Sequence, residues 1–186
     1  NAGARAGDVL VLTKPLGTGL IISAIKANKV FGEHISLATK SMVLLNNTAA
    51  ESMLEVGVSA CTDITGFGLI GHGYELAEAS NVTLSFFAER IPIFDGCERY
   101  VEMGLIPGVS KLSKKYLKDA VRIDPKVREG LVDILFDAQT SGGLLISLPK
   151  GKVELLCTKL REKGVMTAEI IGEVHKRRDV SIIVTP

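Results

Sequence analysis

The sequence has no tryptophan, and aromatic residues make up only 5% of its 186 residues. A surface that stacks nucleic-acid bases needs aromatic side chains, so this composition argues against one. The chain also has no excess of either charge, because 22 lysines and arginines face 21 aspartates and glutamates for a formal net charge of +1. Binding to nucleic-acid phosphates needs clustered positive charge, so we expect no nucleic-acid partner.

Cysteine is scarce and widely spaced, at Cys61, Cys97 and Cys157. An odd number of distant cysteines excludes a disulfide framework and the CxxC metal and redox motifs, and it fits a reducing cytoplasm. HExxH and GxSxG patterns are missing as well, which argues against a zinc protease site and a serine nucleophile of that type.

Long apolar runs are missing too, since none approaches the roughly 18–20 residues that cross a bilayer, and we expect no membrane association. The chain is nevertheless 46% hydrophobic, which is too much for a disordered protein. It begins at Asn1 without a charged and then apolar leader, so we expect no targeting signal and interpret the chain as a fragment or a processed protein.

The hydrophobic pattern alternates between strand-like and helix-like segments, without repeats or an internal linker. This interleaving predicts one α/β sandwich with a mixed sheet, over residues 8–186, after a linker remnant at 1–7. A terminal hairpin, with its turn at 175–179, is part of this prediction. Strands are predicted at 9–13, 58–61, 82–87, 134–136, 144–148, 168–174 and 180–185, and helices at 20–28, 41–56, 69–79, 93–103 and 152–163, with 105–130 unassigned.

The segment from Ala60 to His72, ACTDITGFGLIGH, is the most informative. Asp63 is a hard oxygen donor of the kind that Mg²⁺ selects, and the glycines of its loop allow close approach of a ligand. A helix follows directly, so free N–H groups and the positive end of its dipole would face the loop. The loop could therefore hold a metal–phosphate complex. The alternative is that Asp63 or Thr65 only caps the helix, and spacing alone favours that alternative.

Two further loops carry glycines. From Gln139 to Gly143 the sequence QTSGG offers side-chain hydrogen-bonding groups and two unhindered amides, which suit either an oxyanion or phosphate contact or an ordinary turn. The KPLGTG segment, from Lys14 to Gly19, lacks the spacing of a phosphate-binding P-loop.

Other polar residues allow simpler interpretations. His72 fits packing or hydrogen bonding better than catalysis, and Cys61 fits a small buried residue better than a nucleophile. Five basic residues fall at helical spacing and predict one basic stripe, either a solvated helix face or an anion-binding surface. They are Lys111, Lys114, Lys115, Lys118 and Arg122.

Taken together, the motifs resemble the C-terminal domain of selenophosphate synthetase (selenide, water dikinase), within the superfamily of aminoimidazole ribonucleotide synthetase. The resemblance covers nearly the whole chain. It rests on GDVLVLTKPLGTG (Gly7–Gly19), ACTDITGFGLIGH (Ala60–His72), DAQTSGGLLISLP (Asp137–Pro149) and the ending IIGEV (Ile170–Val174).

The resemblance implies a three-layer α/β/α fold, similar to the C-terminal domain of aminoimidazole ribonucleotide synthetase. It implies an enzyme, a kinase-type phosphotransferase of selenium metabolism, that makes selenophosphate from selenide, ATP and water and releases AMP and phosphate. By position, Asp63 matches the metal-binding aspartate of this domain, with Mg²⁺ as the cofactor. ATP, the nucleophile (cysteine or selenocysteine) and the homodimer contacts would belong mainly to an N-terminal domain outside this chain.

The sequence departs from the family pattern at Ala138, where proline is usual, and at PGVSKLSKK after Ile106, where the family commonly has PGG followed by an Arg-Asn pair and this segment has no arginine. Because the resemblance gives this chain only one metal ligand and places the nucleophile in the other domain, we expect no catalytic residue in this chain and no activity of the chain alone. Two other functions stay open: a non-catalytic interaction module that uses the basic stripe, and a related ATP-dependent enzyme with another substrate.

Overall fold

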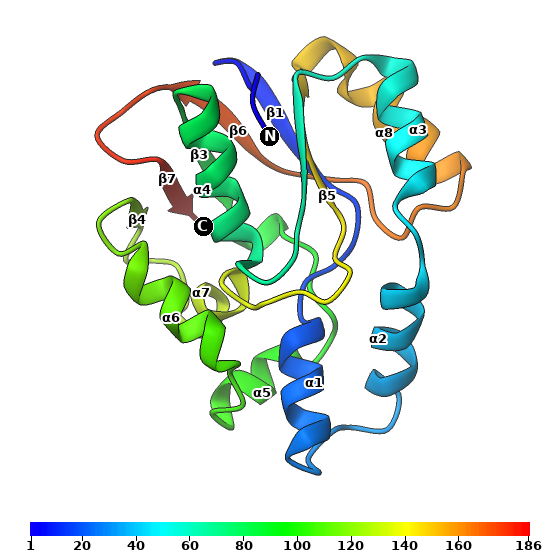
Figure 1. Ribbon diagram of the computed structural model, residues 1–186, viewed down its shortest axis with the longest axis vertical. Helices are drawn as coiled ribbons and strands as arrows, with labels where there is room; N and C mark the ends of the chain where they lie inside the picture. Colours follow the sequence, from blue (N-terminus) through cyan, green and yellow to red (C-terminus); the bar gives the residue numbers. More distant parts are fainter.

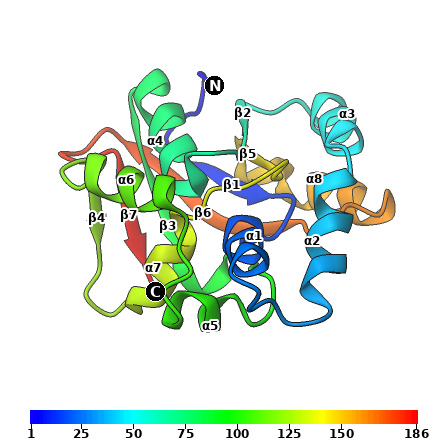
Figure 2. The same ribbon diagram turned by 60° about the horizontal axis from the view of Figure 1, so that its bottom comes forward.

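A computed structural model describes all residues, 1–186, as one seven-stranded sheet with helices on both faces (Figures 1 and 2). The strand order is β2-β5-β1-β6-β3-β7-β4. The pairings are antiparallel except for β7, which runs parallel to both β3 and β4. The strands are β1 (Asp8–Leu12), β2 (Ala60–Asp63), β3 (Val82–Phe87), β4 (Val121–Ile123), β5 (Leu144–Pro149), β6 (Glu169–Lys176) and β7 (Ile182–Thr185).

Eight α-helices surround this sheet, and none combines the length and apolar character that a bilayer-spanning segment needs. Several end at a residue with positive φ, where glycine or asparagine is favoured: Asn81 ends α4 with φ 53°. The helices are α1 (Thr18–Lys26), α2 (His34–Val43), α3 (Asn47–Val56), α4 (Gly68–Ser80), α5 (Cys97–Glu102), α6 (Gly108–Tyr116), α7 (Glu129–Leu135) and α8 (Val153–Glu162).

The two faces of the sheet bury separate hydrophobic cores because side chains alternate along each strand. On β1, Leu10 and Leu12 enter a core of 33 buried residues, whereas Val11 enters a second core of 11. The larger core is covered by α1, α4, α5 and α7. Both views show α3 and α8 together on the other side of the molecule, over the smaller core. The predicted α/β sandwich with a mixed sheet is confirmed.

The prediction of one helix over 41–56 is wrong, because α2 ends at Val43 and α3 begins at Asn47. The buried ammonium group of Lys14 donates hydrogen bonds to the carbonyl oxygens of Ser41 and Leu44, at 2.9 and 2.6 Å. These carbonyls lie at the C-terminal end of α2 and have no partner in a following turn, so a distant residue of the loop after β1 satisfies them.

Two other predicted elements are shorter or of another kind. Ile134 and Leu135 were predicted in a strand but form the last turn of α7, because their neighbours follow a helical rather than an alternating burial pattern. The helix predicted over 93–103 covers only Cys97–Glu102. Its first residues instead pair with the loop after β1, where Phe94 N–H donates to the Leu16 carbonyl oxygen at 2.9 Å.

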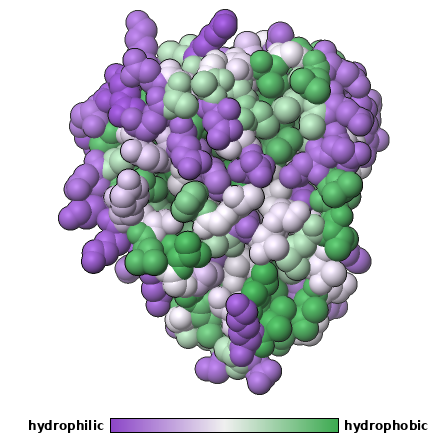
Figure 3. Space-filling view, in the orientation of Figure 1, coloured by the Kyte–Doolittle hydropathy of each residue, from purple (hydrophilic) through white to green (hydrophobic).

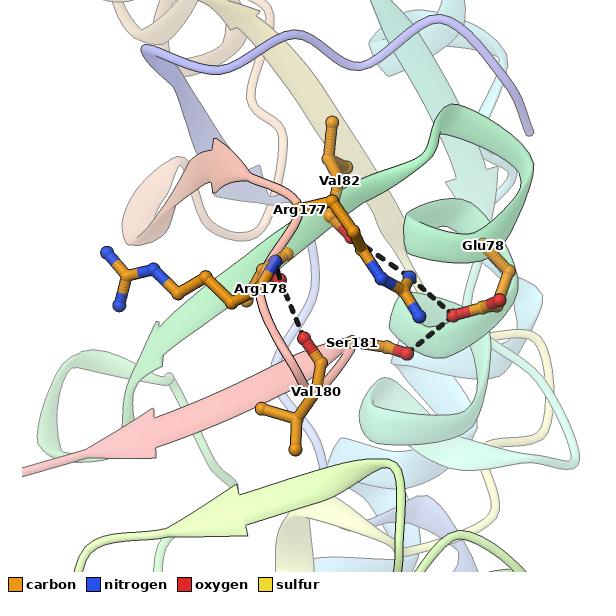
Figure 4. A network of polar contacts seen from close by, with 7 residues as sticks. Glu78, Val82, Arg177, Arg178, Val180 and Ser181 are labelled. Atoms are coloured by element: carbon orange, nitrogen blue, oxygen red, sulfur yellow. Dashed lines mark hydrogen bonds and ion pairs between the residues drawn. The ribbon is translucent and has the colours of Figure 1, made fainter.

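The predicted terminal hairpin is also wrong, since β3 lies between β6 and β7. The connection from β6 to β7 crosses the end of β3 and reaches the last turns of α4. There Arg177 and Ser181 both donate hydrogen bonds to the Glu78 carboxylate, at 2.5 Å each, as Figure 4 shows. These bonds lower the pKa of Glu78, Ser181 having the larger effect. Long-range contacts of this kind have no signal in the local sequence.

Candidate functional site

The three glycine-bearing loops of the sequence meet at one end of β2, β1 and β5, which Figure 2 shows side by side. Backbone hydrogen bonds join two of them, because Ile64 N–H donates to the Gly143 carbonyl oxygen and Gln139 N–H donates to the Thr65 carbonyl oxygen, both at 2.9 Å. The third loop joins through Thr13, whose hydroxyl accepts from Leu144 N–H at 2.8 Å. Segments that are far apart in the sequence thus form one continuous surface. We call it the loop floor; it consists of the segments 14–19, 64–67 and 139–143.

Gln139 and Asp137 cap the N-terminus of α1 from across this floor. The Gln139 side-chain oxygen accepts hydrogen bonds from the amides of Gly17 and Thr18, at 3.1 and 3.2 Å. The Asp137 carboxylate accepts from the amides of Gly19 and Leu20, at 3.1 and 3.3 Å. The first-turn amides of α1 are therefore already occupied, and a phosphate has no free donors there.

Asp137 is a buried carboxyl group in this cap, and one of its oxygens, Oδ1, has no hydrogen-bond partner. Burial disfavours the charged form and raises the pKa of Asp137 to about 7. The hydrogen bonds that its other oxygen accepts act in the opposite direction without cancelling the burial.

Lys14 anchors the floor to the helices beside it. Its buried ammonium group donates to the Ser141 carbonyl oxygen at 2.8 Å, in addition to the two carbonyls at the end of α2. Burial lowers the pKa of Lys14. Asn46 adds a second link, since its amide nitrogen donates to the Gly142 carbonyl oxygen at 2.9 Å. The turn at 139–143 is thus held from both sides.

Asp63 lies exposed at the end of β2, opposite Leu144 of β5. No group of three or more histidine, cysteine, aspartate or glutamate side chains that could hold a metal ion occurs in the structure. Mg²⁺ commonly takes only one or two carboxylates from a protein and completes its shell with waters and phosphate oxygens. The donor chemistry of Asp63 fits one ligand of a site whose other ligands come from elsewhere.

The structure removes the alternative that Asp63 or Thr65 caps the following helix. α4 has no side-chain cap, and the N–H of its first residue, Gly68, donates to a backbone group, the Thr65 carbonyl oxygen, at 3.0 Å. Gly68 has φ +70°, and a Cβ atom there would lie 2.8 Å from the Phe136 backbone, so this position requires glycine. The tight contact brings the N-terminus of α4 against the 136–139 segment.

The Thr65 side chain instead forms a hydrogen-bonded chain with α4. Its hydroxyl lies 2.9 Å from Nε2 of His72, and Nδ1 of the same ring lies 3.1 Å from Oε2 of Glu75. His72 is buried and both its ring nitrogens have partners. The expectation that His72 packs and hydrogen-bonds agrees with this geometry. Sequence reasoning missed Glu75, although the spacing of three residues from His72 on a helix was the signal for it.

The protein-family comparison decides the assignment. The model of the family described as "AIR synthase related protein, C-terminal domain" matches residues 5–185. The chain belongs to this family.

Relatives of this AIR synthase related domain show which enzymes of the family the chain is similar to along its length. A "Selenide, water dikinase" of Caldanaerobacter subterraneus subsp. tengcongensis is 49% identical over 185 residues, which are 99% of this chain and 53% of the relative. The chain thus spans about half the length of the curated relatives it matches. The resemblance to selenide, water dikinase is confirmed as homology over the whole chain.

Solved structures confirm the fold of this AIR synthase related domain. The E. coli hydrogenase maturation protein HypE matches with a TM-score of 0.67 at 16% identity, over 96% of this chain and 46% of that one. Thiamine monophosphate kinase from Aquifex aeolicus matches with a TM-score of 0.60 at 19% identity, over 98% of this chain and 51% of that one. At these identities the likeness concerns the fold alone.

Two weaker candidates for functional groups, the Cys61 thiol and the predicted basic stripe, are not supported by the structure of this AIR synthase related domain. Burial raises the pKa of Cys61 to about 12, so its thiol stays protonated and is no activated nucleophile. The predicted basic stripe is also wrong, because α6 ends at Tyr116 and Arg122 lies on β4. Lys114 pairs with Asp133 at 2.6 Å, and Arg122 pairs with Asp179.

The surface around the loop floor is apolar on two sides. Figure 3 shows a pale centre on this face, with apolar side chains gathered over α6 and over the junction of α2 and α3. Exposed leucines account for them, among them Leu112 on α6 and Leu45 at the junction.

Proposed function

We propose that this domain is one part of a selenide, water dikinase, which makes selenophosphate from selenide, ATP and water and releases AMP and orthophosphate. Homology to such enzymes along the whole chain supports the proposal. The observation that carries it is the position of Asp63: a lone exposed carboxylate at the end of β2, in the loop that leads to the N-terminus of α4, which has no side-chain cap.

In this proposal Asp63 supplies one ligand to Mg²⁺, which neutralises the negative charge of a polyphosphate and orients it. This chain holds the Asp63 carboxylate in place and supplies an electrostatic field that favours a bound anion. The N-terminus of α4 carries a partial positive charge, which favours an anion near Asp63 without any excess of basic residues. This agrees with the balanced net charge of the chain.

The remaining machinery, in this proposal, lies in a second, N-terminal domain of a longer protein. That domain would bind ATP, provide the cysteine or selenocysteine nucleophile and form a homodimer in the cytoplasm. The absence of a multi-carboxylate cluster in the described chain supports a shared site, because one exposed carboxylate holds Mg²⁺ weakly by itself.

The test is Asp63→Asn in the dikinase that contains this domain. We expect selenophosphate and AMP formation to fall at least about a hundredfold, because the amide loses the ligand's charge while the fold stays intact. The exposed Asp119 is a matched control, and Asp119→Asn should keep full activity. Circular dichroism checks the fold of both variants. Full activity of Asp63→Asn would refute the metal role.

A second measurement uses the 186-residue chain alone. We expect no Mg²⁺-dependent ATP hydrolysis above the background rate, measured as phosphate release. Sustained turnover by this chain that Asp63→Asn abolishes would show that it needs no second domain, and the shared-site proposal would fall.

A further inference from the structure

The hydrogen-bonded chain of Thr65, His72 and Glu75 joins the loop that follows Asp63 to α4. Its two links measure 2.9 and 3.1 Å, and only 10% of the His72 side chain is exposed, against 43% for Glu75. The His72 ring is also tilted against Phe67, with ring centroids 5.6 Å apart. The imidazole thus has little freedom to turn.

For a neutral imidazole, this geometry selects one arrangement of the protons. An ionised carboxylate only accepts hydrogen bonds, so the Glu75 side chain requires the proton of a neutral imidazole on Nδ1 of His72. Nε2 is then an acceptor, and the Thr65 hydroxyl must donate its proton to it. The hydroxyl proton is therefore used inside the protein, and Oγ1 of Thr65 keeps its acceptor capacity for a ligand.

Thr65 is held at its backbone as well. Its carbonyl oxygen accepts from Gly68 N–H at 3.0 Å and from Gln139 N–H at 2.9 Å. The residue is thus fixed by two loops and one helix, two positions along the chain from Asp63. A hydroxyl held so firmly has a defined direction in which it accepts a hydrogen bond.

We propose that His72 and Glu75 are positioning residues that hold the Thr65 hydroxyl as an acceptor for a water molecule bound to the divalent cation at Asp63. This inference rests on the proposed function, since it needs a cation at Asp63. Mg²⁺ keeps several of its waters in protein sites, and each such water is a hydrogen-bond donor. A phosphate oxygen needs a donor instead, so Thr65 does not contact the phosphates.

The first test measures the tautomer and needs no catalysis. In the 186-residue chain with ¹⁵N-labelled histidine, NMR at about pH 8 should show the His72 proton on Nδ1 alone. Glu75→Gln should keep that tautomer, because the amide oxygen still accepts from Nδ1, whereas Glu75→Leu should release a mixture. A proton on Nε2 in the unmodified chain would overturn the inference, whatever the enzyme does.

The second test separates the cation from the nucleotide in the dikinase that contains this domain. Thr65→Val keeps the shape and removes the hydroxyl, so we expect the Mg²⁺ concentration at half-maximal activity to rise roughly ten- to hundredfold, as for other groups around a metal's ligands. The KM for ATP at saturating Mg²⁺ should not change. Thr65→Ser should restore the Mg²⁺ dependence, and thermal melting checks that each variant is folded.

The other outcomes are equally decisive. If Thr65→Val raises the KM for ATP and leaves the Mg²⁺ dependence unchanged, the hydroxyl serves a phosphate and the inference is wrong. If neither value moves, Thr65 serves no ligand and the inference is also wrong. A fully active Asp63→Asn variant would instead remove the proposed cation site itself, while the tautomer measurement would keep its meaning.

Discussion

At the scale of single residues, Asp137 shows how a buried charge is used for structure. Its Oδ2 accepts hydrogen bonds from two amides of α1 and from the side-chain nitrogen of Gln139, at 2.9 Å, while Oδ1 has no partner. Burial outweighs these bonds, and the pKa of Asp137 rises to about 7 from an ordinary value of 3.8. The same carboxyl group therefore stabilises the start of α1 and makes stability sensitive to pH.

We predict that the unmodified chain loses stability between pH 5 and pH 8 and that the Asp137→Asn variant does not. A raised pKa means that the folded state keeps its proton after the unfolded state has lost its own, so the free energy of unfolding falls as pH rises from about 4 to about 7. The loss is on the order of a few kcal/mol, from about 1.4 kcal/mol for each unit of pKa. Urea unfolding at both pH values measures it.

The control for this prediction is Asp119→Asn at the exposed position, which should keep the pH dependence of the unmodified chain. If Asp137→Asn loses as much stability between pH 5 and pH 8 as the unmodified chain does, the buried carboxyl group is not the cause.

At the scale of elements, local pattern predicted most helices and strands but not the points where distant residues intervene. The apolar positions in 41–56 are compatible with one helix, and nothing within that segment indicates that Lys14 will bind the carbonyl oxygens of Ser41 and Leu44 near its start. The strand predicted at 82–87 agrees with β3 because its alternation is local. Its place between β6 and β7 depends on packing over about 95 residues of intervening chain, which local pattern cannot carry.

The glycines of the loop floor give the prediction at this scale. A Cβ atom on Gly142 would lie 2.2 Å from the Ile64 carbonyl oxygen, a backbone atom that cannot move without separating the two loops. We predict that Gly142→Ala lowers the free energy of unfolding by about 1–3 kcal/mol, the usual cost of an overpacked site. Urea unfolding at constant pH measures the change.

Gly66 is the matched control, because it lies in the same floor and a Cβ atom there meets nothing within 4 Å. Gly66→Ala should change stability by no more than about 0.5 kcal/mol, or raise it slightly by restricting the unfolded chain. Equal losses for both variants would show that the close approach at Gly142 is not what requires glycine.

At the scale of the whole molecule, composition and periodicity were enough for the α/β class and the mixed sheet. The site was predictable in part: the sequence singled out Asp63 and all three loops, yet it could not show that they meet. Nor could it show that the Gln139 side chain caps α1, because Gln139 is separated by 121 and 122 positions from the two residues that it contacts. The reason is physical, since only the folded sheet brings the ends of β2, β1 and β5 together.

The two cores raise the question of whether the molecule unfolds as one unit. β1 sends Leu10 and Leu12 into one core and Val11 into the other, so loss of either core exposes apolar side chains of the same strand.

We therefore predict that Leu156→Ala in α8, a fully buried residue of the smaller core, weakens both layers together. The free energy of unfolding should fall by about 2–5 kcal/mol, whereas Leu155→Ala, at a side chain that is 53% exposed, should cost less than about 1 kcal/mol. Hydrogen exchange should show reduced protection of β1 and α4 as well as α8, because an opening that spans the shared strands is global. Reduced protection confined to α3 and α8 would instead show that this layer opens by itself.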